Sequence, residues 1–123
     1  MAKPPEPGFR KPLSLPVLHI LLALAQGPRH GYAVKQEVEA RTGGAIRLGP
    51  GTLYEAIQRL EESGLLEESM GGAASEPPNG QEAQRRYYRL TEHGWGVLRS
   101  EIRQLGCLGD AARAHPRLKK GLA

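Results

Sequence analysis

Aromatic residues and cysteine are scarce in this chain of 123 residues. Aromatics make up 5% of it, so a core has to be built mainly from Leu, Val, Ile and Ala. The single cysteine, Cys107, excludes an internal disulfide and is typical of a reducing compartment. No apolar run reaches the roughly 18 residues of a membrane-spanning helix, and no small-residue cleavage site marks a signal peptide. We therefore expect a cytoplasmic protein without a membrane partner.

The length suits one domain, and a domain this small buries a modest share of its surface, so a partner subunit is expected. The net charge of +4 comes from the two ends of the chain. Residues 1–12 carry +2 and residues 111–123 carry +4, which leaves −2 for residues 13–110. The basic balance is therefore weak support for a nucleic-acid-binding core. The ends are either solubilising tails or arms that hold DNA.

The clearest helical pattern lies in residues 49–64, GPGTLYEAIQRLEESG. Leu53, Ile57 and Leu60 recur at i, i+4 and i+7, which predicts an amphipathic helix with one apolar stripe. Gly64 suits a left-handed cap at its C-terminal end. Unpaired N–H groups at its glycine-containing start can lie close to a phosphate backbone. On its own this is an ordinary surface helix, and the segments around it decide its role.

Two more helices are predicted before it. Ser14 caps a helix over about 15–26 that is apolar on nearly all sides, which predicts a core on one side and a second subunit on the other. A Gly-Pro break follows, and then a helix over about 30–41 in which Gly31 permits close helix approach. Two helices joined by a short glycine-containing turn predict a helix-turn-helix.

After the predicted helix of residues 49–64, apolar and polar residues begin to alternate, with a period of two residues. Residues 65–70 are predicted to form one strand and residues 85–90 another, with a polar Gly/Pro/Ser-rich loop at 71–84 between them. Tyr88 and Leu90 share one face of the second strand. The predicted fold class is therefore mainly α with a small β-hairpin, a winged helix-turn-helix.

Arginines cluster where such a wing meets DNA phosphates. Arg85 and Arg86 open the second strand, and this position favours a role in phosphate binding. The alternative is a charged, solvated hairpin that protects a sheet edge.

Thr91 caps a last helix that carries a heptad-like apolar seam. The seam suits a dimerisation helix packed against the first helix of another subunit. The predicted dimer interface draws on both helices: Leu18, Leu22, Trp95, Leu98, Ile102 and Leu105. The expected organisation is a disordered arm at 1–12, the DNA-binding domain at 13–90 with its wing at 65–90, a dimerisation helix at 91–112 and a basic disordered tail at 113–123.

Four local motifs carry a resemblance to a known family. They are the apolar first helix, the HGY of residues 30–32, the GTLY of 51–54 with LE and SGLL after it, and the RYYRLT of 86–91. In this order they resemble the PadR family of bacterial and archaeal transcriptional regulators over residues 13–105. The chain is similar to the short members of the family, which lack a long C-terminal domain.

The resemblance implies a homodimer that binds pseudo-palindromic double-stranded DNA near promoters, usually as a repressor. Carried over by position, it implies a DNA-binding set of Tyr32, Gly51, Thr52, Tyr54, Gln58, Arg59, Arg85 and Arg86. In the family a small aromatic effector is often held near the dimer interface. Trp95 is a candidate wall for such a site, and the alternative is a large core residue that seats the last helix.

One residue departs from the family pattern, because Glu55 stands where many members have proline. A carboxylate near phosphates is unfavourable unless Arg59, four residues on, neutralises it or the carboxylate accepts from a cytosine amino group. Glu55 and the acidic middle of the chain also keep open a second reading, a winged-helix protein-interaction module without DNA binding. A third is a dimer whose main function is to bind a ligand.

Enzyme chemistry finds little support in the sequence. The four histidines at 19, 30, 93 and 115 have no metal-ligand spacing with one another or with Cys107. The glycine pairs are turns, and the chain has no phosphate-binding glycine loop. We therefore expect no catalytic residue, metal or cofactor.

Overall fold

The structure is a computed structural model that describes residues 13–69 and 86–122. The predicted arm at 1–12, the wing loop at 71–84 and Arg85 lie outside the described residues. In chain order the elements are α1 (Leu15–Ala25), β1 (Arg29–His30), α2 (Gly31–Arg41), α3 (Pro50–Glu62), β2 (Leu66–Ser69), β3 (Tyr87–Leu90), α4 (Glu92–Arg113), α5 (Pro116–Lys119) and a 3-10 turn (Lys120–Leu122).

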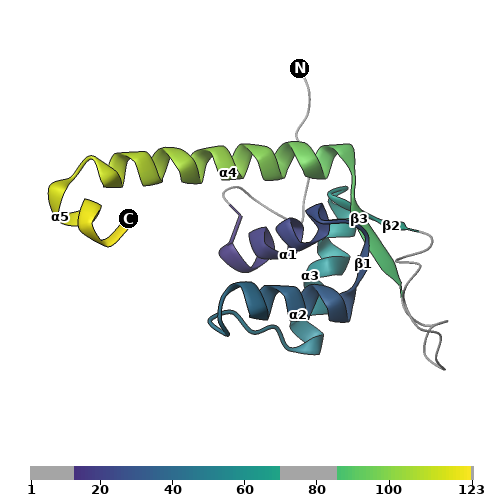
Figure 1. Ribbon diagram of the computed structural model, residues 1–123. Helices are drawn as coiled ribbons and strands as arrows, with labels where there is room; N and C mark the ends of the chain where they lie inside the picture. The colour runs from purple at the N-terminus through teal and green to yellow at the C-terminus, as the bar shows by residue number, and fades with distance from the viewer. Residues whose placement is uncertain (1–12, 70–85, 123) are drawn as a thin grey trace, which may run out of the picture.

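Helices α1, α2 and α3 form a body with the small sheet at one end (Figure 1). Helix α4 packs against α1, runs on beyond this body, and is followed by α5, which turns back (Figure 1). Ser14 starts α1 as predicted, because its hydroxyl accepts a hydrogen bond from the Val17 N–H at 3.4 Å. Side chains from the helices and the sheet meet in one core. Its largest fully buried members come from α1, α2 and α3: Ile20, Leu21, Leu24, Val34, Val38, Leu53, Ile57 and Leu60.

The sheet has three antiparallel strands in the order β1-β3-β2, where the sequence predicted two. Leu66 pairs with Leu90 in the hairpin, and Arg29 pairs with Tyr88 on the other side of β3. Strand β1 is two residues long, too short for an alternating pattern to reveal it. The predicted class, mainly helical with a small sheet in a winged-helix arrangement, is confirmed, with β1 as an addition.

The end of α3 is tied to the start of α4. Gly64 adopts the left-handed conformation predicted for it, with φ of +80°. The Thr91 hydroxyl donates to the Gly64 carbonyl at 2.6 Å and accepts from the Gly94 N–H at 2.9 Å, so it caps α4 while anchoring it. A side chain on Gly94 would collide with the carbonyl of Leu65. Glycine at this position therefore lets α4 lie directly on the turn before β2.

The last segment differs from the expectation of an unstructured tail. Helix α4 ends at Arg113, and α5 begins after His115, whose Nδ1 accepts from the Arg117 N–H at 3.1 Å. Pro116 occupies the first helical position, where its fixed φ is compatible with a helix. A capping side chain followed by proline is a helix-start signal, which the high charge of this segment obscured.

Candidate nucleic-acid interface

The outer face of α3 is set by what the helix buries. Leu53 and Ile57 are 1% exposed and Leu60 is fully buried, so the opposite side of the helix faces solvent. No side chain caps its N-terminus at Gly49, which leaves the first N–H groups available to an anion. Every predicted DNA-binding residue of this helix is exposed: Gly51, Thr52, Tyr54, Gln58 and Arg59. Glu55 and Glu62 are exposed on the same helix.

The ring of Tyr54 packs on the start of α2. A Cβ placed on Gly31 would lie 2.7 Å from both Cε1 and Oη of Tyr54. The close helix approach predicted at Gly31 is therefore confirmed, and it leaves Tyr54 with about half of its surface exposed. Tyr32, the next residue of α2, is also exposed. The structure thus brings these two predicted tyrosines to one surface at the junction of α2 and α3.

A cavity of about 360 Å³ separates α3 from β3. Three predicted DNA-binding residues line it: Tyr54, Gln58 and Arg86. Its other lining residues are ones that the sequence analysis did not assign to DNA binding: Ile57, Glu61 and Tyr88. Burial raises the pKa of the Glu61 carboxyl, and repulsion from Glu68 raises it further. Burial likewise raises the pKa of the Tyr88 hydroxyl. The groove between helix and wing therefore contains opposite charges and is not uniformly basic.

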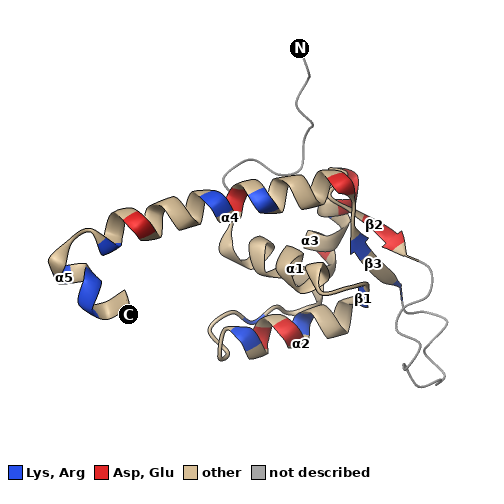
Figure 2. Ribbon diagram, turned by 45° about the horizontal axis from the view of Figure 1, so that its top comes forward, with Lys and Arg blue, Asp and Glu red and all other residues tan. Residues whose placement is uncertain are grey.

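The wing arginines are paired with carboxylates of the neighbouring strand. Arg86 lies 3.3 Å from Glu68, and Arg89 lies 2.8 Å from Glu67. Figure 2 shows this alternation of basic β3 beside acidic β2. Both pairs are well exposed, and exposed pairs of this kind contribute little to stability. Arg86 can therefore exchange Glu68 for a phosphate at small cost.

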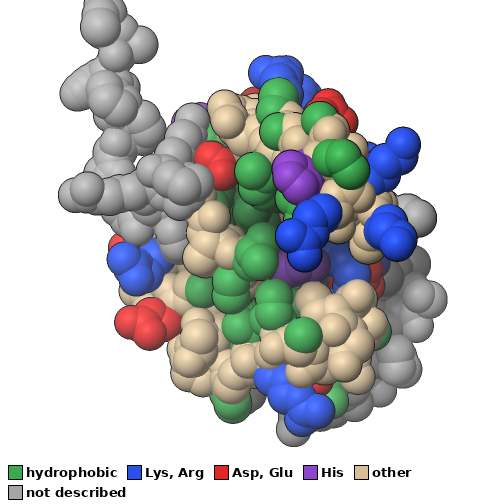
Figure 3. All heavy atoms as spheres, turned by 90° about the vertical axis from the view of Figure 1, so that its left-hand side faces the viewer, with side chains coloured by type: hydrophobic (Ala, Val, Ile, Leu, Met, Phe, Trp, Pro, Cys, Tyr) green, Lys and Arg blue, Asp and Glu red, His purple; other side chains and the backbone are tan. Residues whose placement is uncertain are grey.

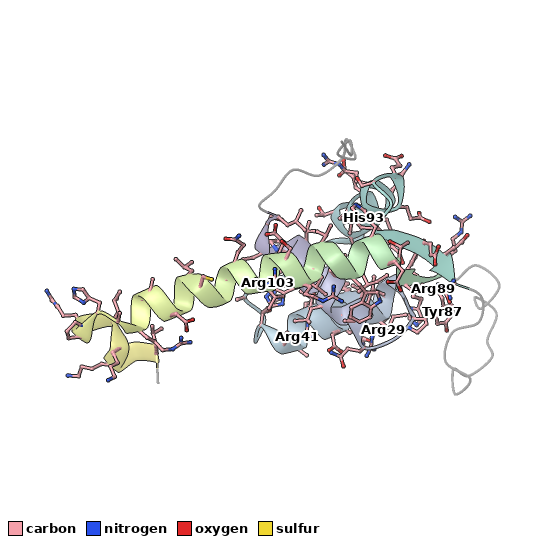
Figure 4. All side chains as sticks on the ribbon, turned by 90° about the horizontal axis from the view of Figure 1, so that it is seen from above. Arg29, Arg41, Tyr87, Arg89, His93 and Arg103 are labelled. Carbon is pink, nitrogen blue, oxygen red and sulfur yellow. The ribbon has the colours of Figure 1, made fainter. Side chains whose placement is uncertain are left out.

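The side of the sheet away from β2 supports α2. His30 ends β1 and caps α2, because its Nδ1 accepts from the Ala33 N–H at 3.3 Å. Its ring meets the edge of Tyr87 in β3, with centroids 5.4 Å apart. Figure 4 shows Tyr87 and Arg89 at the sheet, beyond the start of α4, whereas Arg103 lies further along that helix. The sheet thereby fixes the start of α2 relative to the wing.

The predicted dimer residues differ in how far they are buried. Leu18 and Leu98 are 6% and 5% exposed and belong to the protomer's own core, because α4 packs on α1 within the chain. Leu22 is half-buried. Trp95, Ile102 and Leu105 are exposed on α4. Figure 3, seen from the α5 end, shows hydrophobic side chains gathered along the middle of this face.

The described residues offer no site for catalysis by a metal. They contain no group of three or more His, Cys, Asp or Glu side chains placed to hold an ion. None of the described helices is both long and apolar enough to cross a bilayer.

The order of three helices followed by a hairpin, with β1 completing the sheet, defines the winged helix-turn-helix class. Within that class the chain belongs to the transcriptional regulator PadR-like family, whose model matches residues 20–100. The resemblance inferred from the local motifs is thereby confirmed, and members of this family regulate transcription.

Relatives and solved structures agree with this assignment. The transcriptional regulator Rv3488 of Mycobacterium tuberculosis is 39% identical over 88 residues, which cover 72% of this chain and 73% of that protein. An uncharacterized 37.1 kDa protein in transposon TN4556 of Streptomyces fradiae is 36% identical over 72% of this chain, which matches 22% of its length.

A crystal structure of a PadR family regulator from Eggerthella lenta is 35% identical with a TM-score of 0.53, and 75% of each chain is covered. A PadR-like regulator from Bacillus cereus shares the fold, with a TM-score of 0.64 at 18% identity over 80% of this chain and 87% of that one.

Proposed function

We propose that this regulator binds operator DNA sequence-specifically, with α3 in the major groove and the β2–β3 wing against the flanking phosphates. The observation that carries the proposal is the exposed polar face of α3, where Tyr54 is held by Gly31 beside Arg86 of the wing. A glycine-containing, uncapped helix start approaches a groove closely, and arginine supplies a phosphate contact. The predicted contribution of Arg85 belongs to the same proposal.

The binding unit in this proposal is a homodimer on a pseudo-palindromic operator. Its support is the apolar surface that α1 and α4 leave exposed, which includes Leu15, Ile102, Leu105 and Leu108. Exposed apolar side chains in a continuous patch are typical of a protein–protein interface. In a two-fold dimer each α3 enters one half-site, and the half-site centres lie about 34–36 Å apart, one turn of DNA.

Repression follows if the bound dimer occupies promoter DNA, and release requires a signal that changes the relative position of the two α3 helices. The exposed indole of Trp95 lies on the same helix as the apolar surface of α4. We assign this indole the role of packing against a small aromatic effector that binds at the dimer interface. The proposed function is therefore an effector-responsive repressor that acts in the cytoplasm.

Fluorescence anisotropy tests the proposal. The full chain is titrated into duplex DNA from upstream of its own coding region and into a scrambled duplex, from about 50 to about 300 mM salt. Preferential binding to the upstream duplex that persists as salt rises is the expected result. Equal binding to both duplexes that fades with salt would count against sequence-specific recognition of this DNA and point to the basic C-terminal segment as the source of affinity.

A second candidate function is a winged-helix module that binds another protein. The specific observation in its favour is the charge of α3, which carries Glu55, Glu61 and Glu62 against the single arginine Arg59. Absence of binding to any duplex, together with a stable dimer, would favour this candidate.

A further inference from the structure

We infer that Glu55 of α3 reads a cytosine in each half-site of the operator. The inference rests on the proposed function and adds to it a specificity-determining residue. It starts from the structural position of a carboxylate that is otherwise unfavourable on a DNA-binding helix. Three observations carry it: where Glu55 lies on the helix, what stands one turn before it, and which partners it has.

Glu55 lies at the centre of the exposed face of α3. It is exposed, and it shares a helical face with Gly51 four residues before it and with Gln58 and Glu62 after it. A Cβ placed on Gly51 would meet nothing within 4 Å. The helix therefore presents a smooth first turn, and Glu55 is the first long side chain that this central face offers to a groove. Residues near the N-terminus of a recognition helix are the ones that contact base edges.

The Glu55 carboxylate has no hydrogen bond or ion pair within the described part of the chain. Among the described ion pairs, none joins Glu55 to Arg59, which lies four residues later. Two nearby carboxylates do have partners, since Glu68 pairs with Arg86 and Glu62 accepts from Gln58 at 3.5 Å. An unpartnered carboxylate in a groove is repelled by phosphates on both sides, so a base contact has to offset that repulsion.

The chemistry of the major groove selects the base. An ionised carboxylate only accepts hydrogen bonds, and the donors on base edges there are the amino groups of cytosine N4 and adenine N6. Adenine N7, next to N6, is an acceptor that repels a carboxylate, whereas a glutamine bonds both atoms. Guanine O6 and N7 and thymine O4 are acceptors too. Cytosine is therefore the base from which the Glu55 carboxylate accepts a hydrogen bond. The other three bases are disfavoured because their acceptor atoms repel the carboxylate.

Selection of binding sites from a randomised duplex library tests the inference, with the full-length wild type, Glu55→Gln and Glu62→Gln compared in parallel. Glutamine conserves the size of the side chain at an exposed position, so all three proteins are expected to fold. Glu62→Gln is the matched control, because it removes the same charge from the same face almost two turns nearer the C-terminus. In the wild type we expect a cytosine at one symmetric position of each half-site, preferred about 5-fold to 150-fold over other bases.

Glu55→Gln is expected to replace that cytosine by adenine, which glutamine reads through N6 and N7, while Glu62→Gln keeps the wild-type site. An unchanged consensus with Glu55→Gln overturns the inference and leaves the proposed function intact. The same shift with both variants also overturns it, since the effect would then follow net charge rather than position. If the wild type enriches no sequence, the proposed function itself fails, and the cytosine contact fails with it.

Discussion

Two glycines at helix contacts differ in what surrounds them, and this difference predicts different effects of the same substitution. At Gly94 the new methyl group would meet the backbone carbonyl of Leu65, which cannot move without displacing β2. At Gly31 it would meet the outer end of the Tyr54 side chain, which can rotate toward solvent. The first contact holds the fold together, whereas the second positions a candidate DNA-binding side chain.

Gly94→Ala is therefore expected to lower the free energy of unfolding by about 1–3 kcal/mol, the usual cost of overpacking. Gly31→Ala is expected to cost less stability but to weaken DNA binding, because Tyr54 leaves its position beside Arg86. Urea unfolding and anisotropy on the two variants check this. Equal stability losses, or a Gly31→Ala variant with wild-type affinity, would show that Tyr54 is not positioned by this contact.

Glu61 gives a pH-dependent prediction. Its pKa in the folded protein is raised above the ordinary value of about 4.5 by burial and by Glu68. The folded state therefore binds this proton more tightly than the unfolded chain does, and stability falls as pH rises through the interval between the two pKa values. Above that interval the ionised carboxylate is a constant cost. Glu61→Gln removes the cost, so it should stabilise the protein at neutral pH and lose this advantage in acid.

Urea unfolding at about pH 7 and about pH 4 measures the effect, with Glu62→Gln as the control from the exposed face of the same helix. For Glu61→Gln we expect a free energy of unfolding that exceeds the wild-type value at pH 7 and exceeds it by less at pH 4. A stability difference that is the same at both pH values would mean that burial of the charged form is not what the substitution relieves.

The candidate site was only partly predictable from single residues. Tyr54, Gln58 and Arg59 were accessible to prediction because the apolar stripe of α3 fixes which side of the helix faces solvent. Glu68 was not, since its contact with Arg86 depends on the pairing of β2 with β3 across a long loop. A sequence pattern gives the face of a strand but not its register when the two strands are far apart in the sequence.

At the scale of elements, caps and turns were predicted more accurately than short strands. Ser14, Thr91 and Gly64 each carry a local signal that depends on neighbouring backbone groups, and the structure places all three as expected. Strand β1 and helix α5 were missed because each is too short to show a period. Leu18 and Leu98, which the sequence analysis assigned to a dimer interface, are buried in the protomer's own core, because an apolar helix face does not reveal which of two partners covers it.

The wing as an element predicts how affinity depends on salt. Arg86→Ala should weaken DNA binding and reduce the slope of log affinity against log salt by about 1, since one phosphate contact is lost. Glu68→Gln should act in the opposite direction, because it removes the carboxylate that competes with phosphate for Arg86. Anisotropy titrations across salt measure both effects.

Arg113→Ala is the control for the wing variants, because Arg113 is also exposed and paired with a carboxylate, Asp110, at 3.2 Å, but lies at the far end of α4. We expect it to leave the slope unchanged. If Arg113→Ala changes the slope as much as Arg86→Ala does, the salt dependence reflects overall charge and the wing has no specific role.

At the scale of the whole molecule, α4 is longer than the body that it covers (Figure 1). Glu101 is buried on the face that packs toward α1, where its Oε1 accepts from the Leu13 N–H at 3.2 Å. Leu105 and Leu108 follow four and seven residues later, on the same face of the helix, yet they are exposed. The packing face of α4 thus continues past the protomer's own core, which is the geometry expected of a surface that a second copy covers.

If the proposed dimer forms through this face, Leu105→Asp is expected to convert it to monomers while leaving helix content unchanged, because burying an unpaired carboxylate at an interface is costly and exposing it in a monomer is not. Gln104→Asp adds the same charge at the adjacent exposed position and should stay dimeric. Leu98→Asp should unfold the protein instead, since Leu98 lies in the core. Light scattering and circular dichroism distinguish these outcomes. A soluble Leu105→Asp dimer with wild-type stability would exclude this face of α4 as the interface and would require the proposed dimer to form through another surface.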